Sequence, residues 1–333
     1  MKFSRLSIPA VAGALAMALT TVVPTLISGS AFAQTFPTRP VRLVVPYVAG
    51  GSTDIIGRSM AQQLQEIWGQ SVLVDNRGGG ATIIGTDIVA KGTPDGYVLA
   101  ISTAAFAINP ALFEGKLPYD SLKDFSHIML INTSPLILVV NPSLPAKSVS
   151  ELLALAKAKN GTMNAGSSGV GGAGHLSIEL LNMLGNVQTQ HIPYKGNAPA
   201  LTDLMGGRVD FVFNGTTSVL SLIQAGKLRA LGASGLKRVS ALPDVPTMDE
   251  AGLKGYSSVA WNGISAPAKT PAAIINKINA DANKALASTD VQTRLKNDGS
   301  ESAGGTVKQF QEFIHEETTK WTKVIKVANI KPE

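Results

Sequence analysis

Two glycine-containing loops, each placed just before a helical pattern, carry the residue types best suited to hold a ligand. The first lies in VVPYVAGGSTDIIGR, residues 44–58, where a strand-like run leads into Gly50 and Gly51 and then into a Ser-Thr-Asp run. A helix N-terminus presents unpaired N–H groups and a partial positive charge, and glycine lets an anion approach the backbone without a Cβ in the way. The loop therefore predicts an anion site. The competing interpretation is a tight turn in which one residue of 52–54 caps the helix.

Asp54 has two possible roles in this loop. It could contact a ligand, but its carboxylate would repel an anion, so we expect it mainly to cap the helix or to fix the loop through backbone hydrogen bonds. No Lys follows the glycines at the position that a phosphate-binding loop requires. The anion expected here is therefore a carboxylate, since neutral N–H and hydroxyl donors can satisfy its two oxygens.

The second loop, GVGGAG at 169–174, formally matches the G-x-G-x-x-G pattern of dinucleotide-binding proteins. Its context does not fit that class. The preceding TMNAGSS is short and polar, and no Asp or Glu ends a strand about 20 residues later, where a ribose partner belongs. We therefore interpret the loop as a second anion cradle with hydroxyl donors from Ser167 and Ser168, and keep a nucleotide-binding module as an alternative.

Catalytic and metal-binding patterns are absent from the sequence. No G-x-S-x-G elbow occurs, since GSSGV places Val170 where the second glycine belongs, and no H-E-x-x-H, EF-hand or phosphate-loop pattern is present. The chain has no Cys, and its four His residues match no metal spacing. We predict no enzyme activity, no metal and no cofactor, with a secreted α/β hydrolase as the alternative.

The N-terminus has the pattern of a secretory signal peptide. Lys2 and Arg5 precede a largely apolar run, 8–27, and AFA at 31–33 forms an Ala-x-Ala site, so we predict cleavage after Ala33. The alternative is an uncleaved membrane anchor. In the rest of the chain Lys and Arg are intermixed with Asp and Glu, so nucleic acid is not expected as a partner despite a net charge of +6 for the whole sequence.

Short β-branched runs at 41–47, 71–76 and 97–103 alternate with helical patterns, which predicts βαβ units and a parallel sheet. A second α/β series follows, and two long apolar runs, 134–143 and 258–268, connect the two series. The architecture expected is two α/β halves around a cleft, with both glycine loops at the carboxyl ends of strands, where ligands of open α/β sheets bind.

Helix ends can also be predicted. Gly69 is expected to end the helix after the first loop. Thr270 should cap a helix that has Pro271 at its first position, and Thr306 should cap the last helix.

Several segments resemble those of one known family. They are FPTRPVRLVVPYVAGGSTDIIGR, VDNRGGGATIIGTDIVAKGTPDGYVL, NAGSSGVGGAGHLSIELL, HIPYKGNAPALTDLMGGRVDF, ALPDVPTMDEAGL and WNGISAPAKTP. In this order they resemble the Bug family, the TctC-like solute-binding receptors of tripartite tricarboxylate transporters. The resemblance implies a type II periplasmic binding-protein fold, an α/β fold of two domains hinged around a ligand cleft. The implied domains are 34–137 plus 264–333, and 138–263, after a signal peptide at 1–33.

The resemblance also implies which loops bind the ligand: those after the first and third strands, and two in the second domain. The residues implicated are Tyr47, Ala49, Gly50, Gly51, Ser52, Asp54, Ser102, Thr103, Phe106, Ser167, Ser168, Gly169, Val170, Gly171 and Asn214. Many relatives carry Asp where this chain has Asn214. Because Asn cannot supply a charge to pair with an amine, the departure favours a second carboxylate or an uncharged ligand end over an amino acid.

The function expected is that of a monomeric periplasmic receptor. It would capture an organic carboxylate, either a dicarboxylate or an aromatic carboxylate, and deliver it to the large and small integral membrane subunits of a tripartite transporter.

Overall fold

The computed structural model describes residues 36–194 and 196–332. The predicted signal peptide, 1–33, lies outside the described residues. No helix in the described part of the chain is long and apolar enough to cross a membrane.

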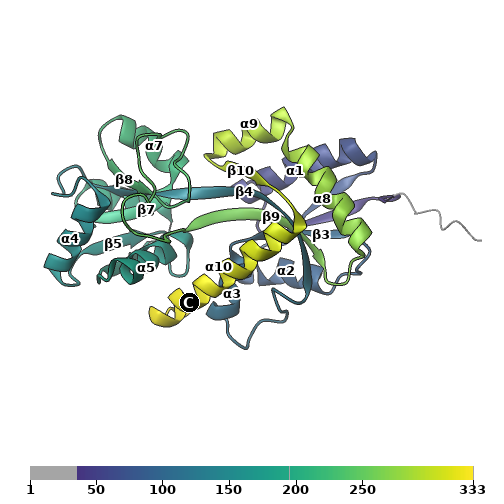
Figure 1. Cartoon of the computed structure of the whole chain (residues 1–333), viewed down its shortest axis with the longest axis horizontal. Helices are drawn as coiled ribbons and strands as arrows, with labels where there is room; N and C mark the ends of the chain where they lie inside the picture. The colour runs from purple at the N-terminus through teal and green to yellow at the C-terminus, as the bar shows by residue number, and fades with distance from the viewer. Residues whose placement is uncertain (1–35, 195, 333) are drawn as a thin grey trace, which may run out of the picture. The chain divides into compact units, whose positions relative to one another are not determined.

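Strands and helices alternate along most of the chain (Figure 1). The strands are β1 (Val41–Val45), β2 (Val72–Asn76), β3 (Val98–Thr103), β4 (Phe125–Val140), β5 (Asn164–Ser167), β6 (Gln190–Pro193), β7 (Phe211–Gly215), β8 (Arg229–Ala233), β9 (Val259–Pro267) and β10 (Glu301–Gly304). The helices are α1 (Ser52–Trp68), α2 (Ile83–Ala90), α3 (Ala105–Leu112), α4 (Val149–Lys159), α5 (Ala173–Gly185), α6 (Asn197–Met205), α7 (Thr216–Gln224), α8 (Ala272–Leu286), α9 (Thr289–Asp298) and α10 (Val307–Val327). A short 3₁₀ turn, η1 (Gly80–Thr82), precedes α2.

The strands follow the order β2-β1-β3-β9-β4-β7-β5-β6, and β8 and β10 also pair with β4. The pairs β1–β2, β1–β3, β5–β6 and β5–β7 are parallel, as the alternating pattern predicts, whereas β4 and β9 run antiparallel to their neighbours. The loops that leave the parallel strands therefore begin at their carboxyl ends, where a ligand is expected.

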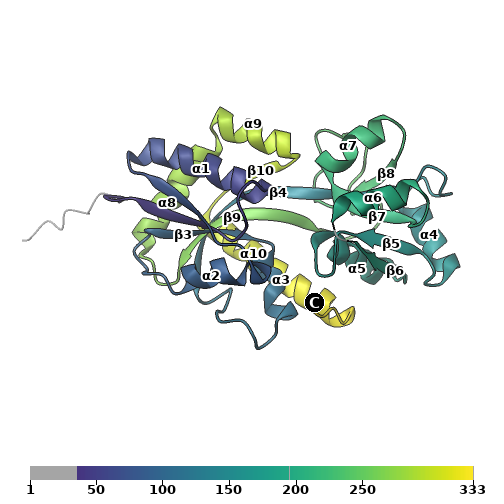
Figure 2. The same cartoon turned by 180° about the vertical axis from the view of Figure 1, so that it is seen from behind.

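Strand β4 passes through both parts of the fold (Figure 2). Its first part, Phe125 to Pro135, pairs with β9, and its last part, Leu136 to Val140, pairs with β7 and β8. We call the elements around β1–β3 the first lobe and those around β5–β8 the second lobe. The sequence predicted a strand only from residue 134, because the preceding residues include polar side chains such as His127 and Asn132, which are buried and hydrogen-bonded in the structure.

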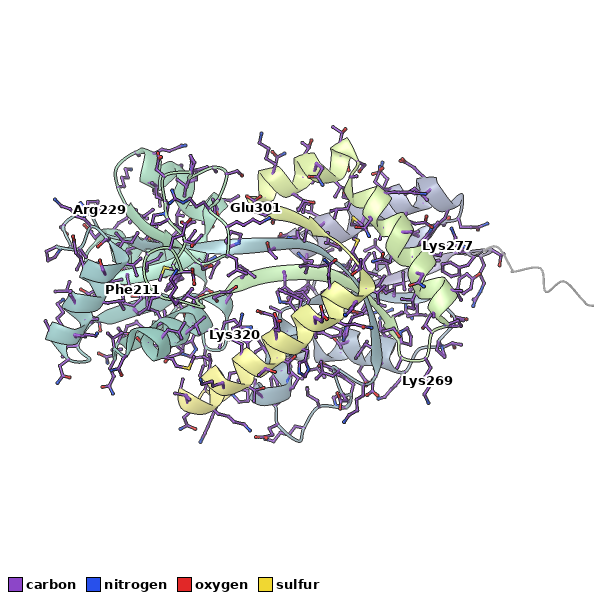
Figure 3. The ribbon with its side chains drawn as sticks, in the orientation of Figure 1. Phe211, Arg229, Lys269, Lys277, Glu301 and Lys320 are labelled. Carbon is purple, nitrogen blue, oxygen red and sulfur yellow. The ribbon has the colours of Figure 1, made fainter. Side chains whose placement is uncertain are left out.

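Apolar clusters lie on both faces of each lobe. In the first lobe, α1, α8 and α9 cover one face through residues such as Ile56, Met60 and Ile278. Helix α10 contacts both α3 of the first lobe and α5 of the second. Glu301 of β10 also accepts a hydrogen bond from the Ser240 hydroxyl at 3.1 Å, which joins the two lobes at the side chain labelled in Figure 3.

The helix ends partly confirm the predictions. Gly69 ends α1 in the left-handed conformation with φ 63°, and Thr306 caps α10 in a capping box with Gln309. The prediction for Thr270 is wrong. Pro271 is itself the N-cap of α8, and the Thr270 hydroxyl donates to the Pro267 carbonyl oxygen at 2.8 Å, because the chain turns tightly after β9.

Candidate ligand-binding site

The first glycine loop ends in a helix start that lacks a cap. Gly51 is the N-cap of α1, and no described side chain accepts a hydrogen bond there. The first bond of the helix runs from Ile55 N–H to the Gly51 carbonyl oxygen at 3.0 Å. Gly50 has φ 91°, a conformation that favours glycine. The N–H groups of the first turn are thus left for another partner, as the anion hypothesis requires.

Asp54 holds this loop together, which is the structural one of its two predicted roles. Its side chain is 3% exposed and accepts hydrogen bonds from Gly50 N at 2.8 Å, Asn76 Nδ2 at 2.8 Å and Arg58 Nε at 3.0 Å. Burial raises the pKa of its carboxyl, but the hydrogen bonds from Arg58, Gly50 and Asn76 outweigh burial, so that the pKa is lowered. A buried carboxylate thereby fixes the shape of the loop.

The second glycine loop has the same kind of helix start. Gly172 is the N-cap of α5, again without a cap from any described side chain, and Gly169 and Gly171 have φ 143° and 72°. Gly171 N–H donates to His175 Nδ1 at 3.0 Å, so this amide is already paired. The Ser167 hydroxyl lies 3.0 Å from the Gly169 carbonyl oxygen, which it donates to.

A Ser–His pair in this loop does not form a catalytic site. Ser167 Oγ lies 2.6 Å from His191 Nε2, and the His191 ring stacks on His175 with centroids 3.7 Å apart. Burial and the neighbouring His175 lower the pKa of His191 to about 4, so its ring is neutral at pH 7. Ser167 is 1% exposed, however, and a nucleophile needs access to its substrate. The Ser167–His191 hydrogen bond therefore stabilises the conformation of the second loop.

Five further helices, α2, α3, α6, α7 and α8, begin without a side-chain cap from the described residues, and three of them begin at the same place as α1 and α5. These three are α3, with Ala104 as N-cap, α6, with Gly196, and α7, with Gly215. The start of α7 has a sequence pattern similar to that of the first loop, Gly215 followed by Thr-Thr-Ser, although the predicted binding residues do not include this run.

The first residues of α1, α3, α5, α6 and α7 line one cavity of about 770 Å³, which we call the cleft cavity. Its walls come from both lobes and from β4 and β9. They comprise Pro46, Tyr47, Ser52, Thr53, Gly79, Ala81, Thr82, Thr103, Ala104, Ala105, Ile108, Asn109, Leu112, Ser134, Pro135, Leu136, Val170, Gly171, Gly172, Ala173, Asn197, Gly215, Thr216, Thr217, Ser218, Ala260, Trp261, Asn262, Asp298 and Gly299.

The electrostatics of the cleft cavity favour an anion. Each helix N-terminus carries roughly half a positive charge, and five of them meet here. Among the described lining residues none is Lys or Arg, and Asp298 is the only charged side chain. The arrangement suits a carboxylate held by neutral N–H and hydroxyl donors.

Five of the predicted binding residues line the cleft cavity: Tyr47, Ser52, Thr103, Val170 and Gly171. The other ten lie beside or behind its walls. They are Ala49, Gly50, Gly51, Asp54, Ser102, Phe106, Ser167, Ser168, Gly169 and Asn214.

Five of these ten are buried: Asp54 and Ser167, described above, and Ser102, Phe106 and Asn214. Ser102 Oγ pairs with Ser265 Oγ at 3.0 Å, and Phe106 packs edge-on against Phe125. Asn214 is 1% exposed, and its Oδ1 accepts from Gly215 N–H at 2.8 Å, while its Nδ2 has no partner among the described residues. The sequence analysis did not identify Asp298, Trp261 or Thr216–Ser218. An Asp-Gly pair after a helix is typical of a simple helix end, and nothing in the sequence places it beside the first loop.

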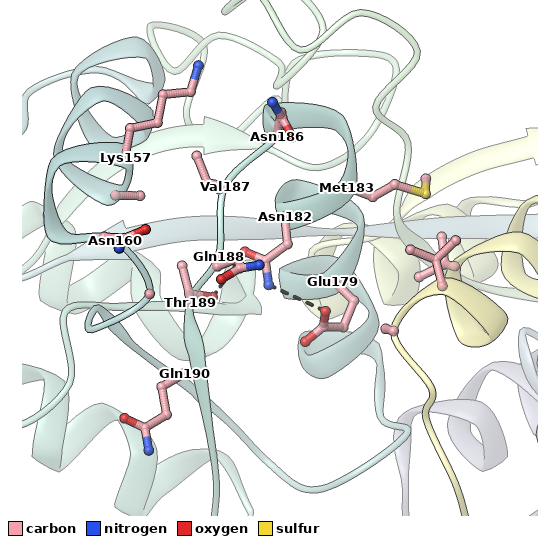
Figure 4. A pocket seen from close by; sticks show the side chains of 15 residues that line it. Lys157, Asn160, Glu179, Asn182, Met183, Asn186, Val187, Gln188, Thr189 and Gln190 are labelled. Atoms are coloured by element: carbon pink, nitrogen blue, oxygen red, sulfur yellow. Dashed lines mark hydrogen bonds between the residues drawn. The ribbon is translucent and has the colours of Figure 1, made fainter.

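A second cavity, of about 890 Å³, is surrounded by helix C-termini and not by helix N-termini (Figure 4). It lies where α4, α5 and α10 end, and includes their C-cap residues Asn160, Asn186 and Ala328. Helix C-termini carry a partial negative charge. This cavity therefore suits an anion less well than the cleft cavity. No group of three or more His, Asp or Glu side chains in the described part of the chain could hold a metal ion.

Comparisons with known proteins identify the family of this chain. A model of the family described as "Tripartite tricarboxylate transporter family receptor" matches residues 56–330. The chain belongs to this family. Its members are periplasmic solute-binding receptors of tripartite tricarboxylate transporters, not enzymes. The family thus confirms the resemblance seen in the sequence.

Individual relatives cover nearly the whole chain. Protein BugT of Bordetella pertussis is 36% identical over 301 residues, which are 90% of this chain and 92% of BugT. The solved structure "R. palustris Rpa4515 with adipate" has 36% identity and a TM-score of 0.71, covering 90% of this chain and 100% of that one. "MatC (Rpa3494) from Rhodopseudomonas palustris with bound malate" has 32% identity and a TM-score of 0.68, covering 87% and 100%. The two-domain periplasmic binding-protein fold is therefore that of this receptor.

Proposed function

We propose that this receptor captures an organic carboxylate in the cleft cavity and delivers it to the large and small membrane subunits of a tripartite transporter. The observation that carries the proposal is the meeting of five helix N-termini, none with a described side-chain cap, around one cavity. Backbone N–H groups at such ends bind carboxylates directly or through water.

The energies are sufficient for a receptor. A hydrogen bond to a charged group contributes roughly 1.5–3 kcal/mol net. Four to six such bonds, less the cost of ordering the ligand and the lobes, reach the roughly −8 kcal/mol that corresponds to micromolar affinity. No Lys or Arg is needed to reach that value.

Two classes of ligand fit the cavity. Dicarboxylates are supported by the relatives whose structures contain adipate and malate. Aromatic carboxylates are supported by the apolar part of the wall, where Ile108, Leu112 and Val170 could pack against a ring.

We further propose that the receptor is a monomer of two domains, 34–137 plus 264–333 and 138–263, and that these domains close around the ligand. The passage of β4 from one lobe to the other supports the division. Hinge closure is the usual response of two-domain receptors to a ligand. Small-angle scattering should show compaction when ligand is added, and an unchanged radius of gyration at saturation would count against closure.

We propose that the N-terminal segment directs export and that cleavage after Ala33 releases the receptor into the periplasm. The mass of the protein recovered from the periplasm checks this directly. A product that retains residues 1–33 would instead support an anchored receptor.

A thermal-shift screen against mono-, di- and aromatic carboxylates tests the proposed function. A ligand that binds only the folded state stabilises it by mass action and so raises the melting temperature. At a ligand concentration of 100 times Kd, the free energy of unfolding increases by about 2.7 kcal/mol. We expect at least one carboxylate to do so, whereas the matching amides and alcohols should not. A melting temperature that responds to no carboxylate would refute the proposal.

A further inference from the structure

Asp298 is an unexpected residue to find in a cavity built for an anion. It is the last residue of α9, and its carboxylate is the only charged group among the described lining residues. We propose that Asp298 is a specificity-determining residue, which makes the receptor prefer a ligand with one carboxylate and an uncharged remainder to a dicarboxylate of the same length. This inference rests on the proposed function and narrows the two ligand classes to one.

Helix stability does not explain why Asp298 is acidic. A negative side chain at a helix C-terminus is repelled by the partial negative charge there, which destabilises the helix. The turn that ends α9 is made by Gly299 in the left-handed conformation with φ 72°, which needs no help from the preceding side chain. The carboxylate is therefore placed against the preference of its own helix.

Hydrogen bonds hold the carboxylate at a fixed place on the wall. Asp298 Oδ1 accepts from Ser52 Oγ at 2.6 Å, and Oδ2 accepts from Ser300 Oγ. Ser300 in turn lies 2.6 Å from Ser134 Oγ on β4. Asn132 Nδ2 donates to Ser134 Oγ at 3.3 Å and so extends the chain of bonds along β4. Because the charge is anchored to a central strand, it cannot easily turn away from an incoming ligand.

Asp298 and Gly299 lie beside two of the helix starts that should bind the ligand. Ser52 is the first residue of α1, and its hydroxyl hydrogen is already given to Asp298. A Cβ built on Gly299 would lie 3.2 Å from Thr216 and Thr217, the first residues of α7. The negative charge thus offsets the positive end of α1 directly, and it belongs to the residue next to the one that meets the start of α7.

A simple count of charge shows the consequence. Five helix N-termini at roughly 0.5 each supply about 2.5 positive charges, of which Asp298 removes one. Asp298 thus lowers the positive charge left for a ligand, which weighs most against a ligand that brings a second carboxylate. A second carboxylate near Asp298 would also meet direct like-charge repulsion.

The opposite wall accepts an uncharged remainder. Ile108 and Leu112 of α3 and Val170 of the second loop line it. Leu112 Cδ2 would be 3.4 Å from a Cβ on Gly171, so α3 and the second loop meet there. An alkyl chain or an aromatic ring can pack on this surface without leaving a charge unpaired.

Isothermal titration calorimetry with size-matched pairs tests the inference. The probes are adipate and its monoamide, and terephthalate and its monoamide, which differ by one charge at similar size. For the wild type we expect tighter binding of the monoamide in at least one pair. In Asp298→Asn the preference should shift toward the dicarboxylate by about tenfold or more.

Asp290→Asn is the matched control. Asp290 also lies on α9 and accepts from a serine of α1, Ser59, at 2.7 Å, but it does not line the cleft cavity. This variant should leave the preference unchanged. If Asp298→Asn does not fold, Asp298→Ser replaces it, because serine also removes the charge and keeps a hydroxyl that can hydrogen-bond on the wall.

The outcomes separate the two proposals. A wild type that binds no probe and no carboxylate of the screen overturns the proposed function, and this inference with it. A wild type that binds carboxylates overturns this inference alone if it prefers the dicarboxylates, if Asp298→Asn leaves the preference unchanged, or if Asp290→Asn shifts it equally.

Discussion

Replacing Gly51 by Val tests whether the first loop touches the ligand. Gly51 has φ −81° and ψ 169°, an extended conformation that valine adopts readily, and no described atom lies within 4 Å of a Cβ built on it. The fold should therefore tolerate the change. The branched side chain would, however, stand at the N-terminus of α1, where the ligand carboxylate is expected.

The expected loss of affinity follows from the hydrogen bonds to the ligand carboxylate that the valine side chain would block. Loss of one or two hydrogen bonds to a charged group costs roughly 1.5–3 kcal/mol each, so the dissociation constant should rise by more than about tenfold. Calorimetry with the best carboxylate measures this, and thermal melting confirms that the fold survives. Gly215→Val at the start of α7, where φ is −59° and the space is equally open, should behave in the same way. Wild-type affinity in a folded Gly51→Val variant would remove the first loop from the site.

Three further predictions concern the scaffold. Asp54→Asn should lower the free energy of unfolding by about 1–3 kcal/mol in urea titration, because three donors lose a carboxylate acceptor; an unchanged value would mean that the loop does not depend on Asp54. Gly263→Ala should destabilise by about 3 kcal/mol, since its Cβ would lie 2.2 Å from Phe310 Cζ, and a neutral effect would contradict the packing of α10 on β9. Burial lowers the pKa of His127 to about 4, so between pH 6.5 and 4 the unfolded state binds more protons than the folded state. The free energy of unfolding should therefore fall as the pH is lowered through this range. The fall should be smaller in His127→Gln.

The sequence predicts those parts of the fold that depend on local patterns. The strands at β1, β2 and β3 are short apolar runs, and the ends of α1 and α10 carry glycine and capping-box signals. The first half of β4 was missed because His127 and Asn132 interrupt its apolar pattern. These side chains are satisfied only by partners far along the chain, Ser265 and Asn262, which no local window contains.

The candidate site shows the same limit. Glycine before a helix start identifies the first two loops, but it does not reveal that five helix starts meet at one cavity, since this depends on the order of the strands. Asp298 is 246 residues from Ser52 in the sequence, yet their side chains share a hydrogen bond. Long-range pairs of this kind are set by the packing of α9 on α1 and leave no trace in the spacing of residues.

A crystal structure with the best carboxylate from the screen tests the central claim most directly. The account predicts the ligand carboxylate in the cleft cavity, within hydrogen-bonding distance, directly or through one water, of backbone N–H groups in the first turn of α1 and of at least one other helix. A ligand bound in the cavity formed by the ends of α4, α5 and α10, or a carboxylate held by Lys or Arg side chains and not by helix N-termini, would contradict it.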